Sequence, residues 1–195
     1  LPYIVNENVT PGTSPNFFAY YLAPNGDRTR LREAGYTEDE VPAGSHAQYV
    51  VPTQAYCDFL AEDARDTRTD VSVRVFEDKF LTEEVQIKRM VVKFIGSFAN
   101  DTRSFDSDVP VYRLAEAYLL KAEVENALGN TDAALQNLNV VAKRAYGVDN
   151  YYTARTQDAI DNAIISEILK EFVAESKAWW AYLRFNKEFE LIETL

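Results

Sequence analysis

Residues 111–145 read VYRLAEAYLLKAEVENALGNTDAALQNLNVVAKRA, a pattern that predicts two helices joined by a tight turn. Over 111–128 the apolar side chains recur every three or four positions and cover most of the circumference, so we expect neighbours on more than one side. Gly129-Asn130 supplies the left-handed end of the first helix. A second helix is expected over about 132–145, and because the linker is so short the two helices must lie antiparallel.

Small residues at the predicted helix contact are typical of tetratricopeptide units, in which paired helices approach each other closely. Ala122, Gly129 and Ala134 fall at the small positions of that repeat, whereas Glu125 stands where the repeat usually has an aromatic residue. The match is therefore partial, but it predicts a helical hairpin as the main element of the C-terminal half.

The composition changes near Val109-Pro110, because six of the seven prolines and five of the seven glycines precede residue 110. We expect Asp108 to be the N-cap of the first helix, with Pro110 inside its first turn. This division predicts a loop-rich segment over 1–109 and a helical segment over 110–195.

A third helix is expected over about 157–186, with apolar residues along one side. It carries three glutamates at a spacing of four residues, which repel one another on an isolated helix: Glu167, Glu171 and Glu175. We favour solvent screening together with the helix's own cations, namely Lys170, Lys177 and Arg184. The alternative is a structural salt bridge to Arg113 or Arg144.

The segment before residue 110 contains turn signals, one short helix and two strand-like runs. The helix is expected over about 53–65, with Pro52-Thr53 at its start. Residues 71–76 and 90–95 are rich in branched and aromatic side chains and predict a small antiparallel pair. The predicted fold is therefore mainly α, with tetratricopeptide-like helical pairs, extensive loops and a small antiparallel β hairpin.

Composition and charge exclude several functional classes. The net charge of −11 argues against nucleic acid or an anionic membrane surface as partner. Cys57 is the single cysteine and His46 the single histidine, so a zinc site with Cys and His ligands is excluded. No run of residues is long and apolar enough to span a bilayer, and the first residues do not resemble a signal peptide, so we expect any targeting signal or anchor to lie upstream.

Three blocks of this sequence resemble the SusD/RagB family, cell-surface lipoproteins of Bacteroidetes that bind glycans and pass them to a TonB-dependent outer-membrane transporter. They read PTQAYCDF at 52–59 with Asp63-Ala64-Arg65 after it, DVPVYRLAEAYLLKAE at 108–123, and EFVAESKAWWAYLRF at 171–185. The second block is the most specific, and the third departs from the family pattern. Ser176, Ala178 and Ala181 stand where the family usually has Gly, Arg and Asp.

The resemblance implies that this chain is the C-terminal portion of a surface-exposed outer-membrane protein that works in nutrient uptake and polysaccharide utilisation. Its partners would be an oligosaccharide and a SusC-like TonB-dependent transporter. Membrane association would come only from a lipid anchor upstream of this chain, because Cys57 lies in a predicted helix and cannot be the lipidated residue.

Aromatic residues in the first loops are the candidate glycan site, because a flat ring beside hydrogen-bonding side chains suits a sugar. The predicted ligand-binding residues are Tyr20, Tyr21, Asn25 and Arg28. The alternative is that the rings of this segment, Phe17 and Phe18 above all, belong to the core. Trp179 and Trp180 are interpreted as helix packing.

No catalytic motif is visible, so we expect no enzyme activity, no cofactor and no metal. We interpret His46 as an exposed loop residue, because it lies in a turn. The Asp-rich loop 100–108 could offer oxygen ligands to calcium, but it lacks the glycine and the closing glutamate of an EF-hand. Two other functions stay open: a tetratricopeptide-type protein-interaction scaffold and, less favoured, a glycoside hydrolase that uses two carboxylates.

Overall fold

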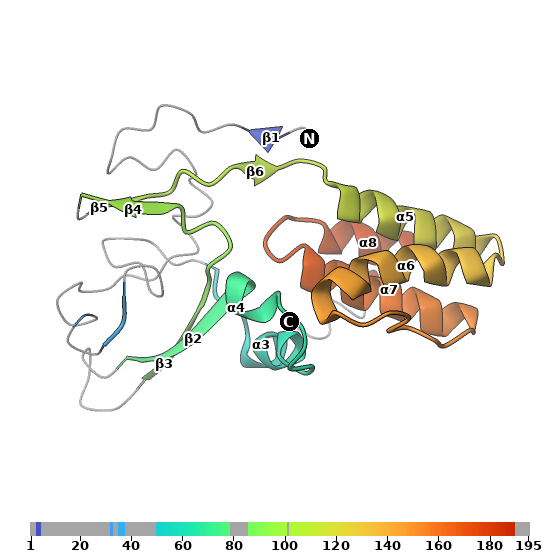
Figure 1. The fold of residues 1–195 in the computed structure, drawn as a ribbon, viewed down its shortest axis with the longest axis horizontal. Helices are drawn as coiled ribbons and strands as arrows, with labels where there is room; N and C mark the ends of the chain where they lie inside the picture. Colours follow the sequence, from blue (N-terminus) through green and yellow to red (C-terminus); the bar gives the residue numbers. More distant parts are fainter. Residues whose placement is uncertain are drawn as a thin grey trace. The chain divides into compact units, whose positions relative to one another are not determined.

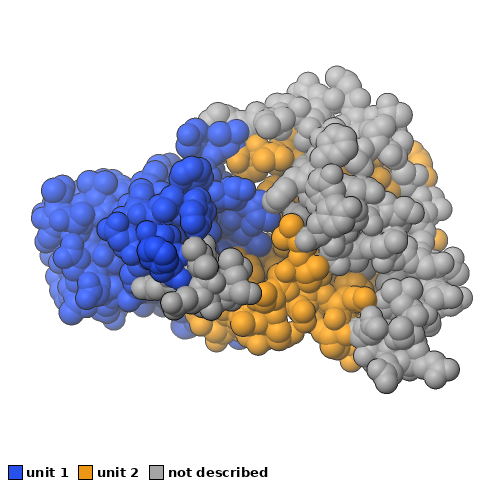
Figure 2. Space-filling view, turned by 180° about the vertical axis from the view of Figure 1, so that it is seen from behind, with its two compact units in different colours: residues 1–2, 63–68, 111–195 blue, residues 3–62, 69–110 orange. Residues whose placement is uncertain are grey.

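The computed structural model describes residues 3–4, 32, 35–37, 50–78, 86–100 and 102–189. The chain divides into two compact units, coloured separately in Figure 2. One unit combines residues 63–68 with the helical part after residue 110, and the other contains residues 3–62 and 69–110. Residues 63–68 therefore belong to the helical unit, although they are far in sequence from its helices.

The helical unit contains α5 (Leu114–Ala127), α6 (Thr131–Tyr146), α7 (Gln157–Glu171) and α8 (Ala178–Arg184). Figure 1 shows α5 and α6 as an antiparallel hairpin with α7 packed along both. Gly129 has a φ of 78° in the turn between α5 and α6, a left-handed conformation that glycine adopts at little cost. The predicted mainly α fold and the helical hairpin are confirmed.

One hydrophobic core holds α5, α6 and α7 together. Ala122 on α5 and Ala134 on α6 are completely buried, as expected for small residues that allow close helix approach. Larger side chains fill the remaining space, and the most deeply buried of them are Leu119, Leu138, Ile160 and Ile164. Tight burial of this kind makes each large core side chain costly to truncate.

The first helix does not begin where the sequence predicted. Val109–Pro110 forms the short strand β6, which pairs with β1 (Tyr3–Ile4), and α5 begins only at Leu114. The N-cap is Arg113, whose side chain makes no capping hydrogen bond because carboxylates of α7 and the following turn bind it. Proline fits a strand that ends at an edge, since it lacks the N–H that a ladder needs.

The expected third helix is wrong in its length, because it is broken into α7 and α8. The chain leaves α7 after Glu171 and turns through Ala174 and Ser176, which have φ values of 58° and 59°. An α-helix cannot continue through left-handed residues. Ser176 occupies the position where the resembled family usually has glycine, the residue that adopts this conformation most easily.

The other unit contains three separate two-stranded antiparallel sheets among its described residues: β1–β6, β2–β3 and β4–β5. The second sheet is formed by β2 (Val73–Asp78) and β3 (Gln86–Val91), and the third by β4 (Ser97–Ala99) and β5 (Thr102–Ser104). Two short helices precede them, α3 (Gln54–Leu60) and α4 (Thr69–Ser72).

The predicted hairpin is confirmed as an antiparallel pair, but its strands, 73–78 and 86–91, are shifted from the expected runs 71–76 and 90–95. In the pair Val73 lies opposite Val91 and Asp78 opposite Gln86, while part of the expected first strand belongs to α4. Phe76, Met90 and Val92 form the core of this part of the unit. Burial on one face therefore fixes the register.

The short helix begins as predicted, because the Thr53 side chain accepts a hydrogen bond from the backbone N–H of Tyr56. It ends at Leu60, earlier than expected, and Cys57 is buried inside it. The residues after it form the turns that lead into the helical unit.

Candidate functional site

The predicted glycan-binding residues Tyr20, Tyr21, Asn25 and Arg28 lie outside the described residues, and so do Phe17, Phe18 and His46. The loop site stays a prediction. The described part of the helical unit instead contains two features with functional chemistry: a buried cluster of ion pairs and a pocket between α5 and α8.

Two consecutive Asp-x-Arg turns lead into the ion-pair cluster. In the first turn, predicted from the family resemblance, Asp63 Oδ1 accepts hydrogen bonds from the backbone N–H and Nε of Arg65, at 3.0 and 2.9 Å. In the second turn Asp66 Oδ1 accepts the same two bonds from Arg68, at 3.0 and 2.8 Å. The first arginine is exposed, whereas the second is buried.

Arg68 is the centre of the ion-pair cluster. Its Nη1 donates to Glu167 Oε2 at 2.8 Å and to Glu171 Oε2 at 3.3 Å, and its Nη2 donates to Asp66 Oδ2 at 2.7 Å. Tyr146 and Tyr152 donate their hydroxyls to Glu167 Oε1 at 3.0 and 2.9 Å. The Glu167 side chain, with no exposed surface, is thus fully supplied with donors.

Arg113 forms the second half of the cluster at the start of α5. Its Nε and Nη2 bind both carboxylate oxygens of Glu175 at 2.8 and 2.9 Å, a bidentate geometry. Its Nη2 also donates to the Glu171 carbonyl at 2.6 Å, and its Nη1 and Arg144 both bind the Glu171 carboxylate. The same guanidinium therefore binds the end of α7 and the turn that follows it.

These contacts overturn the interpretation that solvent and local cations offset the glutamate spacing. Glu167, Glu171 and Glu175 are buried and are paired with arginines from distant segments, so the alternative involving Arg113 and Arg144 is the correct one. Arg68 was missed, although the repeated Asp-x-Arg pattern in 63–68 was a signal for it. Glu175 lies beyond the end of α7, so it does not share that helix face.

The pKa values follow from these contacts. Burial alone would raise the pKa of Glu171, but hydrogen bonding to Arg113 and the charges of Arg113, Arg144 and Arg68 hold it below its usual range. Burial likewise opposes ionisation of Asp66, but hydrogen bonds from Arg68 hold its pKa below the ordinary value. Burial and then the charge of Glu167 raise the pKa of Tyr146.

Acid should therefore weaken the fold. Because Asp66 and Glu171 have lower pKa values when folded than when unfolded, they stabilise the fold fully above their unfolded pKa values, about 3.9 and 4.3. That stability is lost as the pH falls through those values toward the folded ones. We expect the free energy of unfolding in urea to decrease steadily from about pH 5 to pH 3. A stability that stays constant or rises over this range would contradict the described ion pairs.

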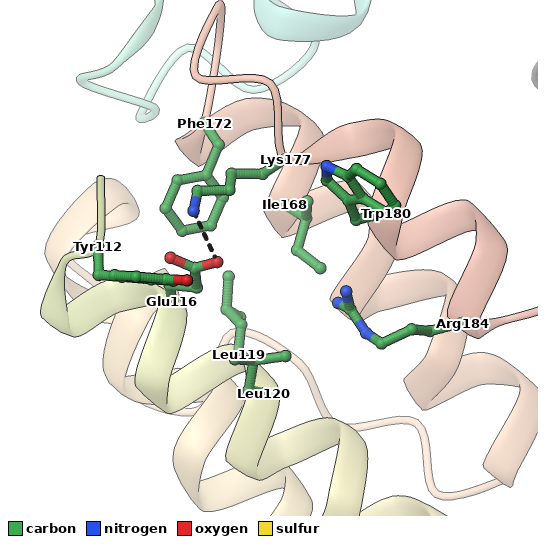
Figure 3. A pocket seen from close by; sticks show the side chains of 9 residues that line it. All are labelled: Tyr112, Glu116, Leu119, Leu120, Ile168, Phe172, Lys177, Trp180 and Arg184. Atoms are coloured by element: carbon green, nitrogen blue, oxygen red, sulfur yellow. Dashed lines mark ion pairs between the residues drawn. The ribbon is translucent and has the colours of Figure 1, made fainter. Parts of the chain in front are cut away.

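The pocket has a volume of about 370 Å³ and lies between α5 and α8 (Figure 3). Trp180 contributes to its wall and is 60% exposed, and Trp179 is 43% exposed. The interpretation of both tryptophans as helix packing is therefore wrong. Their exposure arises because α8 is a separate short helix whose buried residue is Ala181.

One carboxylate of the Asp-rich loop 100–108 is hydrogen-bonded to the hairpin formed by β4 and β5. Asp106 accepts hydrogen bonds from the Ser97 backbone N–H at 2.8 Å and from the Ser97 hydroxyl at 2.6 Å, so its carboxylate closes the loop around β4 and β5. Over the described ranges no three His, Cys, Asp or Glu side chains gather into a possible metal site. No helix in the described part of the chain is both long and apolar enough to cross a membrane.

The helical hairpin, the α7 layer and the internal ion pairs define a helical scaffold of the tetratricopeptide-like class. A family model described as the SusD family matches residues 62–193, and the chain belongs to that family. A SusD-like protein of Formosa agariphila is 28% identical over 94 residues, which cover 45% of this chain and 19% of that protein.

Solved structures agree with this assignment. A SusD superfamily protein of Bacteroides fragilis superposes with a TM-score of 0.67 at 26% identity, over 92% of this chain and 38% of that one. A SusD superfamily protein of Bacteroides vulgatus gives 0.56 at 25% identity, over 74% and 34%. The fold of Bacteroides fragilis NanU is also similar, with a TM-score of 0.57 at 22% identity, over 85% and 37%. The chain thus spans less than half the length of each of these relatives.

Proposed function

We propose that this chain is part of a cell-surface protein that binds an oligosaccharide without cleaving it and delivers it to a SusC-like TonB-dependent outer-membrane transporter. The observation that carries the proposal is the SusD family match over residues 62–193. The family's members are non-catalytic binding proteins of the outer membrane, so we place this protein at the bacterial surface, held by a lipid anchor upstream of this chain.

The helices provide the frame in this proposal, and loops provide recognition. The ion-pair cluster fixes α5, α7 and the turn after α7 relative to one another through paired charges, which leaves these carboxylates engaged in structure. Glycan specificity would come from shape, stacking and hydrogen bonding at the loop residues Tyr20, Tyr21, Asn25 and Arg28.

Calorimetry against a panel of neutral oligosaccharides tests the proposal. At least one of maltoheptaose, cellohexaose, laminarihexaose or xylohexaose should bind, with no release of reducing ends. Tyr20→Ala and Tyr21→Ala should each weaken binding about tenfold, because a stacking ring is lost. Tyr20→Phe and Tyr21→Phe keep the rings and should bind nearly as well as the unchanged chain. Release of reducing ends would instead support a glycoside hydrolase.

A tetratricopeptide-type interaction scaffold is the second candidate, and the outer face of α5 favours it. Leu114, Val124 and Leu128 are 65%, 57% and 69% exposed on that face, and an exposed group of apolar side chains is typical of protein-interaction surfaces. A scaffold of this kind predicts no heat from any glycan. Co-purification with a SusC-like transporter, without glycan binding, would support it over our proposal.

A further inference from the structure

The pocket between α5 and α8 combines an apolar floor with flat rings at its two ends. Leu119, Ile168 and Phe172 are buried beneath it, and Tyr112 and Trp180 are 59% and 60% exposed. Figure 3 shows Tyr112 on the α5 side and Trp180 across the pocket on α8. Its volume of about 370 Å³ lies in the lower part of the roughly 300–1,000 Å³ typical of small-molecule sites.

The charges around this pocket already balance one another. Lys177 Nζ lies 3.0 Å from Glu116 Oε1 and donates to the Val111 carbonyl at 2.8 Å. Arg184 Nε donates to both carboxylate oxygens of Glu123, at 2.8 and 3.0 Å. An anionic ligand would therefore have to compete with these carboxylates for the two cations.

Two hydrogen-bonding groups are left over at the pocket. Glu116 Oε2 is buried and has no hydrogen-bond partner among the described residues. The Arg184 guanidinium turns toward the pocket (Figure 3), and its terminal amino groups donate to none of the residues that the structure describes. Glu116 Oε2 has almost no accessible surface, so a ligand in the pocket cannot reach it, but the terminal amino groups of Arg184 can donate to a ligand hydroxyl.

We propose that this pocket binds one neutral pyranose unit of a glycan, an inference that rests on the proposed function and adds a second recognition site on the helices. The C–H face of the sugar stacks on Trp180, and a hydroxyl of the sugar accepts from the terminal amino groups of Arg184. A purely apolar side chain from a protein partner would fill the space but leave the Arg184 amino groups without an acceptor.

Tryptophan fluorescence tests this site directly, because the chain has two tryptophans and they are neighbours on α8. Titration with the oligosaccharide panel named above should change the emission, and Trp180→Ala should abolish the change and weaken binding about tenfold. Trp179→Ala is the matched control and should leave both unchanged, since Trp179 does not line the pocket.

A second variant probes the polar contact. Arg184→Lys keeps the charge opposite Glu123 but removes the forked donor, so binding should weaken about fivefold. Circular dichroism of each variant confirms that the helices are intact.

The outcomes separate the two proposals. If a glycan binds and Trp180→Ala binds it equally well, the pocket is not a sugar site, while the proposed function stands. If no glycan binds the unchanged chain, both proposals fail. If a tryptophan-containing peptide binds in a Trp180-dependent manner and no glycan does, the pocket is a protein-docking site and this inference is overturned.

Discussion

Replacing Arg68 with alanine is expected to lower the free energy of unfolding by about 3–5 kcal/mol, the cost of breaking a buried ion pair by removing one partner. The Arg68 side chain is 9% exposed, and the side chains of Asp66 and Glu167 are 1% and 0% exposed. Without the guanidinium these carboxylates would remain in the interior without their main counter-charge. Urea unfolding followed by circular dichroism measures the loss.

Arg65→Ala is the matched control, because Arg65 makes the same Asp-x-Arg turn in an exposed position. Its Nε and Nη2 bind Asp63 at 2.9 and 2.6 Å, but its side chain is 56% exposed. Water and salt screen such a pair, so the loss should be far smaller than for Arg68. If both variants lost the same free energy of unfolding, the geometry of the turn, and not the burial of charge, would account for the stabilisation.

A double variant isolates the unpaired charge. Glu167→Gln in the Arg68→Ala background removes one buried carboxylate while keeping an oxygen that accepts from the Tyr146 and Tyr152 hydroxyls. We expect the double variant to be more stable than Arg68→Ala alone. A further loss of stability would contradict the view that an uncompensated charge dominates the effect.

The helical hairpin could be predicted because its signals are local. The apolar periodicity of 111–128, the small residues Ala122 and Ala134, and the stop at Gly129 each depend on residues close in sequence. The structure places them as expected, with both alanines fully buried and Gly129 in the left-handed region. The family resemblance was carried by the same local patterns.

The ion-pair cluster could not be predicted because its partners are distant in sequence. Arg68 and Glu167 are 99 positions apart, and Arg113 and Glu175 are 62 apart. A glutamate spacing of four residues indicates a helix face, but it does not indicate which cations form ion pairs with those glutamates. The repeated Asp-x-Arg motif of 63–68 was the only local sign that an arginine was available.

The break between α7 and α8 was missed because the residues at it are not helix breakers. Ala174 and Ser176 adopt positive φ values in a turn that the Arg113 contacts to Glu171 and Glu175 hold at both ends. Glycine at position 176 would have indicated the turn directly. The same break exposes Trp180, so the missed turn also explains the missed pocket.

Leu138→Ala is expected to lower the free energy of unfolding by about 2–5 kcal/mol. Leu138 lies in the middle of α6 with no exposed surface, in the core that joins α5, α6 and α7. Truncation removes apolar contacts and leaves a cavity that neighbouring helices cannot close completely, because the alanines at the α5–α6 contact already bring their backbones close together. Urea unfolding under the same conditions as for Arg68 gives the value.

Leu114→Ala provides the control for Leu138→Ala, since it removes the same atoms from a leucine that is 65% exposed on α5. Its stability should stay within about 0.5 kcal/mol of the unchanged chain, because little apolar surface returns to water. A large loss at Leu114 would show that the outer face of α5 is covered when the chain folds. A small loss at Leu138 would mean that the helices do not share the described core. Comparing the free energies of unfolding of the two Leu→Ala variants therefore shows whether the buried or the exposed face of the helices stabilises the helical unit.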